Sequence, residues 1–323
     1  MKEFEINKND ASQRLDRFVS KAVPLLPSSL LQKYIRLKRI KVNGKGAKRD
    51  TRLNLGDTVQ MYINDEFFDA PAPENVYLTV ENPDLDIVYE DENILLVNKK
   101  PGVLCHETEG WSAATLIARI QAYAYQKREW RPREENSFAP ALCNRIDRNT
   151  GGIVIAAKNA EALRIMNEKI KNREIEKYYL CVVCGVPKPR AGTLTDYIFK
   201  DAVKNQVYIK SRPEPGTKTA VTKYRTLETE NGLSLVECEL LTGRTHQIRA
   251  QLANAGYPLL GDGKYGSEKL RRQYGEKGQA LWSYKVKFAF STDAGALEYL
   301  KNREFSVKNV PFVQKYFSFA DFH

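Results

Sequence analysis

The stretch of this chain that decides the fold is Ala141-Leu142-Cys143-Asn144-Arg145-Ile146-Asp147-Arg148-Asn149-Thr150-Gly151-Gly152, which runs directly into Ile153-Val154-Ile155-Ala156-Ala157. The second segment is apolar and predicts a buried strand, and the Thr-Gly-Gly sequence before it predicts a tight turn. Asp147 stands between Arg145 and Arg148, and nearby guanidinium groups favour the ionised form of a carboxylate. An ionised carboxylate can act as a nucleophile or as a base. On these residues alone, a surface ion pair that closes a turn is the simpler interpretation, so the rest of the chain has to decide.

Strands and helices are predicted on both sides of this stretch. Before it, residues 85–91 and 94–99 have the apolar pattern of two strands. After it, residues 160–171 predict a helix with a buried apolar face, and residues 176–185 predict another strand. A second informative segment, 241–266, begins with the end of a strand and continues as a short helix that Gly and Pro terminate. The stretch around Asp147 is therefore expected to lie inside a domain of mixed helices and strands.

The central stretch resembles a known active-site motif. Residues 144–152 read N-R-I-D-R-N-T-G-G and resemble H-R-L-D-x-x-T-S-G, the motif of the RluA-like family of RNA pseudouridine synthases. The Arg, Asp, Thr and final Gly positions match. Asn144, Ile146 and Gly151 stand where the family usually has His, Leu and Ser.

Three further segments carry the same resemblance. Residues 89–106 are similar to the family's Y-E-D-x-x-I-L-x-V-N-K-x-P-G-x-x-x-H, and residues 177–185 are similar to its K-x-Y-L-A-x-V-x-G. Residues 242–266 are similar to T-G-R-T-H-Q-I-R-x-H-L…G-x-P-I-x-G-D-x-x-Y-G, with Gln251 in place of the second His. These motifs follow one another in the family's order, and with the N-terminal segment the resemblance covers essentially the whole chain.

The resemblance implies a reaction and three catalytic residues. The chain would isomerise specific uridines in structured RNA to pseudouridine, by cleaving the N1–C1′ bond and rejoining the base through C5. Asp147 would be the nucleophile or base, Arg249 would pair with it and keep it ionised, and Tyr179 would lie against the flipped base. The isomerisation involves no redox change, so the resemblance implies no cofactor and no metal. The three histidines stand at no metal-ligand spacing.

The resemblance also implies contacts with RNA around this centre. Arg145 corresponds to the family residue that fills the space left by the flipped base or holds the displaced strand, a role that suits a guanidinium group. Arg244 and His246 stand at the start of the short helix after residue 243, where anions such as RNA phosphates are favoured. His106 could line the cleft, and a loop histidine with a solvent or carboxylate partner is an equal alternative.

The first 63 residues predict a separate small module. Apolar spacing predicts helices over 12–23 and 29–39, with Ser12 as the N-cap of the first and Ser28 or Ser29 as the N-cap of the second. A strand that ends in an Asn-Gly turn follows, which is a strong signal for a β-hairpin. The outer face of the second helix is expected to carry four cations, Lys33, Arg36, Lys38 and Arg39.

This module resembles the S-four-like RNA-binding domain, which is named after a small-subunit ribosomal protein. The resemblance is carried by residues 14–17 (R-L-D-R), the basic helix, residues 42–44 (V-N-G) and residues 55–57 (L-G-D). It implies that the basic helix face lies on RNA phosphates, which supply affinity and positioning without sequence choice. A solvated helix face is the alternative for each cation taken singly.

The distribution of charge supports a nucleic-acid partner. The net charge is +11, and residues 1–62 hold 14 of the 51 Lys and Arg but only 6 of the 40 Asp and Glu. A small basic module beside a nearly neutral one indicates a polyanion. An anionic membrane surface is disfavoured because no basic amphipathic helix with bulky interfacial aromatic residues is predicted.

Length and composition fit a two-domain globular protein of α+β class. We expect the basic helix-hairpin domain over 1–63, an extended Pro-containing linker over 64–83, and a catalytic domain over 84–323 with a mixed, mostly antiparallel sheet and flanking helices. No run approaches the ~18 apolar residues of a membrane span, and the N-terminus lacks the apolar core of a signal peptide. Five cysteines in apolar settings argue against a disulfide framework, so a cytoplasmic location is expected.

Two other functions compete with this interpretation. A catalytically silent RNA-binding or ribosome-assembly protein would explain the departures at 144, 151 and 251. A glycosidase would need two carboxylates in one site; Glu237 and Asp262 are the candidates for the second, and Asp262 is expected to be only a turn residue between two glycines. RNA is the expected partner, with ribosomal RNA favoured and transfer RNA possible, and no obligate protein partner is implied.

Overall fold

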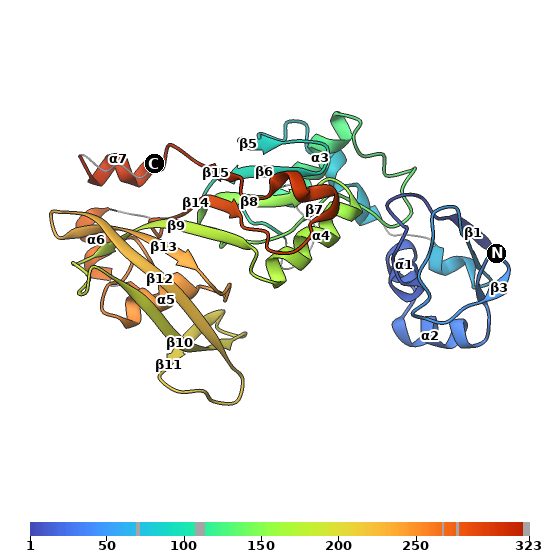
Figure 1. Cartoon of the computed structure of the whole chain (residues 1–323), viewed down its shortest axis with the longest axis horizontal. Coiled ribbons are helices and arrows are strands. Elements are labelled where there is room, and N and C mark those ends of the chain that lie inside the picture. Colours follow the sequence, from blue (N-terminus) through green and yellow to red (C-terminus); the bar gives the residue numbers. More distant parts are fainter. Residues whose placement is uncertain (69–71, 107–113, 267, 276–277, 319–323) are drawn as a thin grey trace.

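The chain forms two β-sheets, each with its own helices (Figure 1). The computed structural model describes all residues except 69–71, 107–113, 267, 276–277 and 319–323. A four-stranded sheet has the order β1-β4-β2-β3, and an eleven-stranded sheet has the order β11-β10-β12-β13-β9-β14-β8-β6-β5, with β15 on β14 and β7 on β8. Most strand pairs are antiparallel, and β14 runs parallel to β8. The predicted α+β class, with a mostly antiparallel sheet, is confirmed.

The N-terminal unit (residues 1–63) packs two helices on the small sheet. Its elements are β1 (Lys2–Glu5), α1 (Leu15–Ala22), α2 (Ser28–Arg36), β2 (Ile40–Val42), β3 (Lys45–Gly46) and β4 (Thr58–Met61). Its core is separate from the others and includes Leu15 and Phe18, both fully buried. The predicted hairpin turn is present, because Asn43 and Gly44 have φ values of 51° and 74° and join β2 to β3. Two consecutive left-handed residues give the turn type that matches strand twist.

The predicted helix boundaries in this unit need correction. Ser12 does not cap α1: it has φ 64° and its N–H donates to the carbonyl of Leu53, and Arg14 occupies the N-cap position. Neither Ser28 nor Ser29 caps α2, because that helix begins directly after Pro27, whose fixed φ suits a helix start.

The second helix also ends earlier than predicted. It stops at Arg36, and Lys38 has φ 57° in the following turn. Lys38 and Arg39 therefore lie beyond the helix. All four predicted cations, including Lys33, are nevertheless exposed on one segment of the surface.

The segment expected to be an extended linker contains two 3₁₀ helices, Asp65–Phe68 and Ala72–Thr79. Tyr77 and Val80 are buried against α3 and Trp130. The prediction of extended character was therefore wrong: apolar side chains near the end of this segment give it a surface to pack on, which the alternating prolines concealed.

The larger unit begins near residue 84. Its elements are β5 (Ile87–Glu90), β6 (Ile94–Lys99), α3 (Leu116–Gln126), β7 (Ala141–Leu142), β8 (Gly151–Ala157), α4 (Ala160–Lys171), β9 (Ile175–Cys184), β10 (Ala191–Asp201), β11 (Gln206–Lys210), β12 (Thr217–Glu230), β13 (Leu233–Leu240), α5 (Gln247–Asn254), α6 (Glu268–Tyr274), β14 (Leu281–Phe288), a 3₁₀ helix (Gly295–Leu300), β15 (Glu304–Ser306) and α7 (Pro311–Tyr316). The C-terminal segment of the sequence is rich in aromatic residues; Phe317 is buried, whereas Phe319 and Phe322 lie outside the described residues.

The strand β8 lies between β14 and β6 in the interior of the sheet and is buried along its whole length. Its alternate residues point to opposite faces, so Ile153 and Ile155 pack under α4, and Val154 packs under α3. The helix α5 packs on β9 and β13. Ile146 belongs to the clusters of both α3 and α5, which places the stretch around Asp147 on that face of the sheet.

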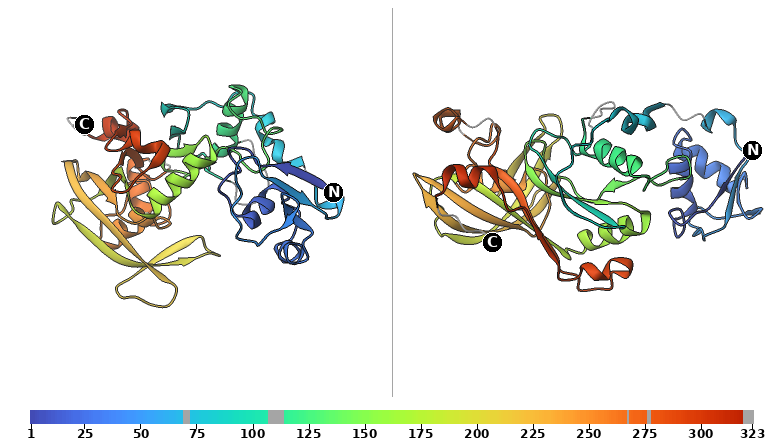
Figure 2. Two further views of the ribbon diagram at one scale, coloured as in Figure 1. Left: turned by 45° about the vertical axis from the view of Figure 1, so that its right-hand side comes forward. Right: turned by 90° about the horizontal axis from the view of Figure 1, so that it is seen from above.

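The N-terminal unit lies beside the segment before β7 (Figure 2), and polar side-chain contacts join the two. The Asp10 carboxylate is fully buried and accepts hydrogen bonds from Asn136 Nδ2 at 2.7 Å and Ser137 Oγ at 2.5 Å. Asn9 donates to Glu135 at 2.7 Å and accepts from the N–H of Ala160 at the start of α4. In the part of the chain that is described, no helix combines the length and apolar character needed to cross a bilayer.

Candidate active site

Asp147 meets Arg249 across 102 residues of sequence. Asp147 lies in the turn between β7 and β8, where the N–H of Thr150 donates to its carbonyl at 3.1 Å. Arg249 lies on α5, and its Nη1 donates to Asp147 Oδ2 at 2.9 Å. The arginine is buried, whereas the side chain of Asp147 is 27% exposed. The contact expected between these two residues is therefore present, and the carboxylate has one side open to solvent.

A second carboxylate holds the same arginine. Asp262 is fully buried, and its oxygens accept from Arg249 Nε at 2.7 Å and Nη2 at 2.9 Å. Burial alone would raise the pKa of Asp262, but the hydrogen bonds and charge of Arg249 outweigh burial and lower it. The expectation that Asp262 is only a turn residue was wrong. Because Asp262 is fully buried and shares Arg249, it is not placed to act as the second acid of a glycosidase.

Tyr179 approaches Asp147 from the middle of β9. It is 6% exposed and packs with Ile248 of α5 and Leu281 of β14. Burial raises the pKa of Tyr179 to about 12, a hydrogen bond with Ser283 opposes the rise, and the charge of Asp147 adds to it. Tyr179 is therefore a neutral phenol whose position beside Asp147 is set by the sheet.

His246 faces the carboxylate from the N-cap of α5. Its Nε2 lies 3.9 Å from Asp147 Oδ2, and its Nδ1 is 2.9 Å from the hydroxyl of Tyr265. Burial, reinforced by the positive charges of Arg249 and Lys264, lowers the pKa of His246 despite the nearby Asp147. The histidine is therefore neutral near pH 7, inside the site.

Two glycines allow β8 to start close to β14. A Cβ on Gly151 would lie 2.4 Å from the ring of Trp282, and a Cβ on Gly152 would lie 2.2 Å from the backbone oxygen of Ser283. Gly152 also has φ 110°, a conformation that side chains other than glycine rarely adopt. The family's Ser at position 151 is thus excluded here by Trp282, which fills that space.

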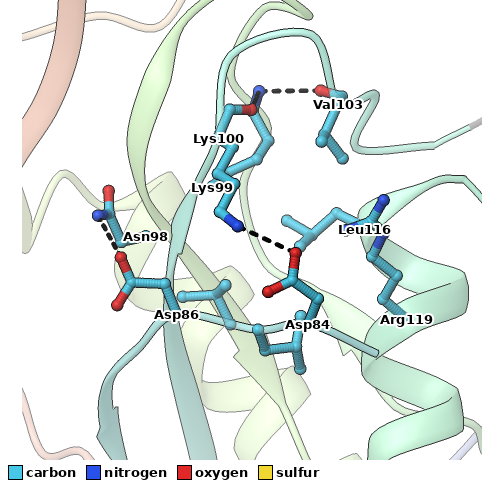
Figure 3. Close-up of a pocket in the computed structure, with 10 residues that line it drawn as sticks. Asp84, Asp86, Asn98, Lys99, Lys100, Val103, Leu116 and Arg119 are labelled. Carbon is cyan, nitrogen blue, oxygen red and sulfur yellow. Dashed lines mark hydrogen bonds and ion pairs between the residues drawn. The ribbon is translucent and has the colours of Figure 1, made fainter. Parts of the chain in front are cut away.

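Lys99 supports the turn from beneath, and it was not among the predicted site residues. Its Nζ is buried and donates to three carbonyls, those of Val103 at 2.8 Å, Arg148 at 2.9 Å and Lys100 at 3.1 Å. Figure 3 shows the contact with Val103. Burial lowers the pKa of Lys99 to about 8, with Cys105 and Asp147 opposing the shift. The segment N-K-x-P-G was its only signal in the sequence.

Comparisons with known proteins identify the family of this chain. The chain matches the family model for RNA pseudouridylate synthase over residues 93–254, half of its length. The chain belongs to this family. It is 31% identical over 263 residues to an uncharacterized RNA pseudouridine synthase of Bacillus subtilis (strain 168), covering 81% of this chain and 82% of the relative.

A second relative and one solved structure extend the picture. The ribosomal large subunit pseudouridine synthase C of Vibrio cholerae is 29% identical to this chain over 301 residues. The alignment covers 91% of this chain and 91% of the relative. The human RNA pseudouridylate synthase domain containing 4 has a TM-score of 0.55 and 20% identity, covering 74% of this chain and 93% of the human one, which supports the fold.

The departures from the family motif have local structural explanations. Asn144 Oδ1 accepts from the N–H of Ile155 at 2.8 Å, so it ties the turn to β8. Gln251 is buried on α5, where it accepts from Thr222 Oγ1 and donates to Asp196 Oδ2. Neither residue displaces Asp147, so the Asp147–Arg249 pair is present despite these two departures.

The remaining predicted residues surround the centre. Arg145 is exposed beside Asp147. Burial and the charge of Arg145 lower the pKa of His106, so these two side chains lie near each other. Arg244 is half-buried and donates from Nε to the carbonyl of Thr219 at 3.0 Å, which turns it toward β12. Their contacts with RNA stay predictions.

Proposed function

We propose that this chain converts uridines in structured RNA to pseudouridine, with Asp147 as its reactive carboxylate. The observation that carries the proposal is the Asp147–Arg249 pair at 2.9 Å, whose two residues both lie in the region that matches the family model. A buried arginine donates a charge-assisted hydrogen bond that fixes the direction of the carboxylate, and the partly exposed side of the carboxylate remains accessible to a nucleotide.

The reaction needs three events at this centre. The target uridine leaves its stack, which costs a few kcal/mol, and Arg145 is the exposed group that would occupy the space. The N1–C1′ bond breaks, the uracil turns, and a C5–C1′ bond forms with loss of the C5 proton. Asp147 acts on the sugar or on the ring, and Tyr179 lines the site as a neutral surface for the base.

The N-terminal unit supplies affinity for RNA in this proposal. We assign residues 1–63 to an S-four-like RNA-binding domain, 64–83 to the connection and 84–323 to the catalytic domain. Support comes from the four exposed cations Lys33, Arg36, Lys38 and Arg39. Phosphate contacts of this kind position a protein on RNA without reading its sequence.

Ribosomal RNA is the proposed substrate, in the cytoplasm. Support comes from the Vibrio cholerae relative, whose name assigns it to the ribosomal large subunit and which aligns over 91% of this chain. The basic N-terminal unit also suits a large folded RNA better than a small molecule.

The experiment is tritium release from RNA that carries ³H at uridine C5. Unmodified ribosomal and transfer RNA are tested separately with the wild type, with Asp147→Asn, and with Asp201→Asn as a control at a surface aspartate of β10. We expect release from ribosomal RNA that Asp147→Asn abolishes and Asp201→Asn preserves. Release that persists in Asp147→Asn would refute its role, and binding without release by the wild type would leave an RNA-binding protein.

A further inference from the structure

The segment from Asp262 to Tyr265 lies behind the site and contacts both groups that face Asp147. Those two groups are Arg249 Nη1 at 2.9 Å and His246 Nε2 at 3.9 Å, and both approach the same oxygen, Oδ2. In the part of the chain that is described, no hydrogen bond reaches Oδ1. The carboxylate thus has one oxygen facing donors and one oxygen free.

Asp262 fixes the first donor directly. It takes Nε and Nη2 of Arg249 in a bidentate pair, which leaves only Nη1 to turn toward Asp147. Its Oδ1 also accepts from the backbone N–H groups of Lys264 at 2.8 Å and Tyr265 at 3.1 Å. The carboxylate is therefore saturated by four donors, and the planar guanidinium has one orientation available.

Tyr265 fixes the second donor. Its ring lies under the guanidinium of Arg249, 5.2 Å from the centroid to Cζ, and meets the ring of His246 edge-on at 5.6 Å. Its hydroxyl contacts His246 Nδ1 at 2.9 Å and accepts from the N–H of Val207 at 3.0 Å. One side chain therefore touches both groups that face Asp147.

These contacts allow either neutral tautomer of His246, and one of them follows when the Tyr265 hydroxyl is the donor. The hydroxyl oxygen of Tyr265 accepts from the N–H of Val207, and in the described part of the chain its own proton has His246 Nδ1 as an acceptor. With Tyr265 donating, Nδ1 accepts, and a neutral imidazole then carries its proton on Nε2. That proton points toward Asp147.

We propose that Asp262 and Tyr265 are positioning residues that hold Arg249 and the Nε2–H tautomer of His246 against Oδ2 of Asp147, so that Oδ1 is the oxygen that reacts. The assignment rests on the proposed function. It changes the role of His246 from a cation for RNA phosphate to a neutral donor beside the carboxylate.

The first test reads the tautomer without any activity. The chain has three histidines, so ¹⁵N-histidine labelling gives few signals, and His106→Gln and His323→Gln assign them. We expect His246 of the wild type to be neutral with its proton on Nε2 near neutral pH. Tyr265→Phe should give a mixture of tautomers, whereas Tyr224→Phe, which removes a hydroxyl bonded to the Pro189 carbonyl, should not. A proton on Nδ1 in the wild type would overturn the proposal.

The second test separates positioning from binding. Tyr265→Phe should lower kcat about tenfold with KM unchanged, the effect of losing one orienting hydrogen bond. Asp262→Asn should lower kcat about a hundredfold, because a misaligned arginine misplaces the carboxylate. Tyr224→Phe should keep the wild-type kcat. A folded Tyr265→Phe variant with unchanged kcat would refute the positioning role, whereas absence of tritium release from the wild type would refute the proposed function and leave the tautomer result standing.

Discussion

Restoring the family's serine at position 151 should damage this protein. A Cβ on Gly151 would lie 2.4 Å, 2.4 Å and 2.6 Å from three atoms of the Trp282 ring, where ordinary contacts begin at 3.4 Å. Either the ring or the start of β8 must therefore move by about 1 Å. The indole is held in place, because its Nε1 donates to Asn98 Oδ1 at 3.1 Å and it packs against Phe312.

The expected destabilisation follows from this overlap. Overpacking a buried site costs about 1–3 kcal/mol, and a buried hydroxyl without a partner adds about 1–3 kcal/mol. We therefore expect Gly151→Ser to lower the free energy of unfolding by about 2–6 kcal/mol. A shift of about 1 Å at the start of β8 also misplaces Asp147, so kcat should fall about a hundredfold in the folded fraction.

The assay is urea unfolding of a double-mutant cycle with Trp282→Leu. Trimming the indole makes room for serine, so the double variant should be more stable than additive effects predict by at least about 1 kcal/mol. Gly243→Ser serves as the control, because a Cβ there meets nothing within 4 Å, and it should change stability by less than about 0.5 kcal/mol. Strictly additive effects in the cycle would refute the steric explanation for glycine at 151.

Four further predictions concern RNA binding, the core and the connection between the units. Replacing Arg36 and Arg39 by Ala should weaken RNA binding regardless of the RNA sequence. The slope of log K for RNA binding against log salt concentration should fall by about 1 for each phosphate that is no longer neutralised. Filter binding across salt concentrations measures both effects. Lys169→Met should lower the midpoint of urea unfolding, because it leaves the Glu174 carboxylate without its cation. The pKa of Glu174 in the folded protein is lowered to about 2, chiefly by Lys169. The stability that ionised Glu174 contributes is therefore complete above the pKa that this side chain has in the unfolded chain, and it is lost as pH falls toward 2. We expect the midpoint of urea unfolding to fall more steeply with acid in the wild type than in Glu174→Gln. Asp10→Ala removes the buried acceptor that joins the N-terminal unit to the segment before β7, so limited proteolysis should cleave between the units faster, and an unchanged rate would contradict that role of Asp10.

Local signals in the sequence were sufficient for the central elements. The apolar run after Gly152 predicted β8, and the apolar spacing over 160–171 predicted α4 with the observed bounds. The Asn43–Gly44 turn was equally clear, since two left-handed residues demand such a pair. These elements share one property: the residues that determine them are neighbours in sequence.

The missed features depend on distant partners. The 3₁₀ segment before residue 80 is ordered by Tyr77 packing on α3 and Trp130, which no local period reveals. β15 is three residues long and forms only because β14 offers an edge for it. Ser12 looked like a helix cap, but its N–H is committed to the carbonyl of Leu53, a distant partner that the sequence does not identify.

The site divides in the same way. The pair of Asp147 and Arg249 was expected because the family resemblance supplied the long-range link that spacing cannot. Asp262 was set aside because an aspartate between two glycines usually marks a turn. That interpretation omits the charge of Arg249. A buried guanidinium needs more acceptors than one partly exposed carboxylate offers. Asp262, 13 residues further along the chain, is the buried acid that supplies them. When the arginine of a candidate Asp–Arg pair is buried, its charge therefore predicts a second, fully buried anion close to it. This requirement identifies a residue such as Asp262, which motif spacing alone does not.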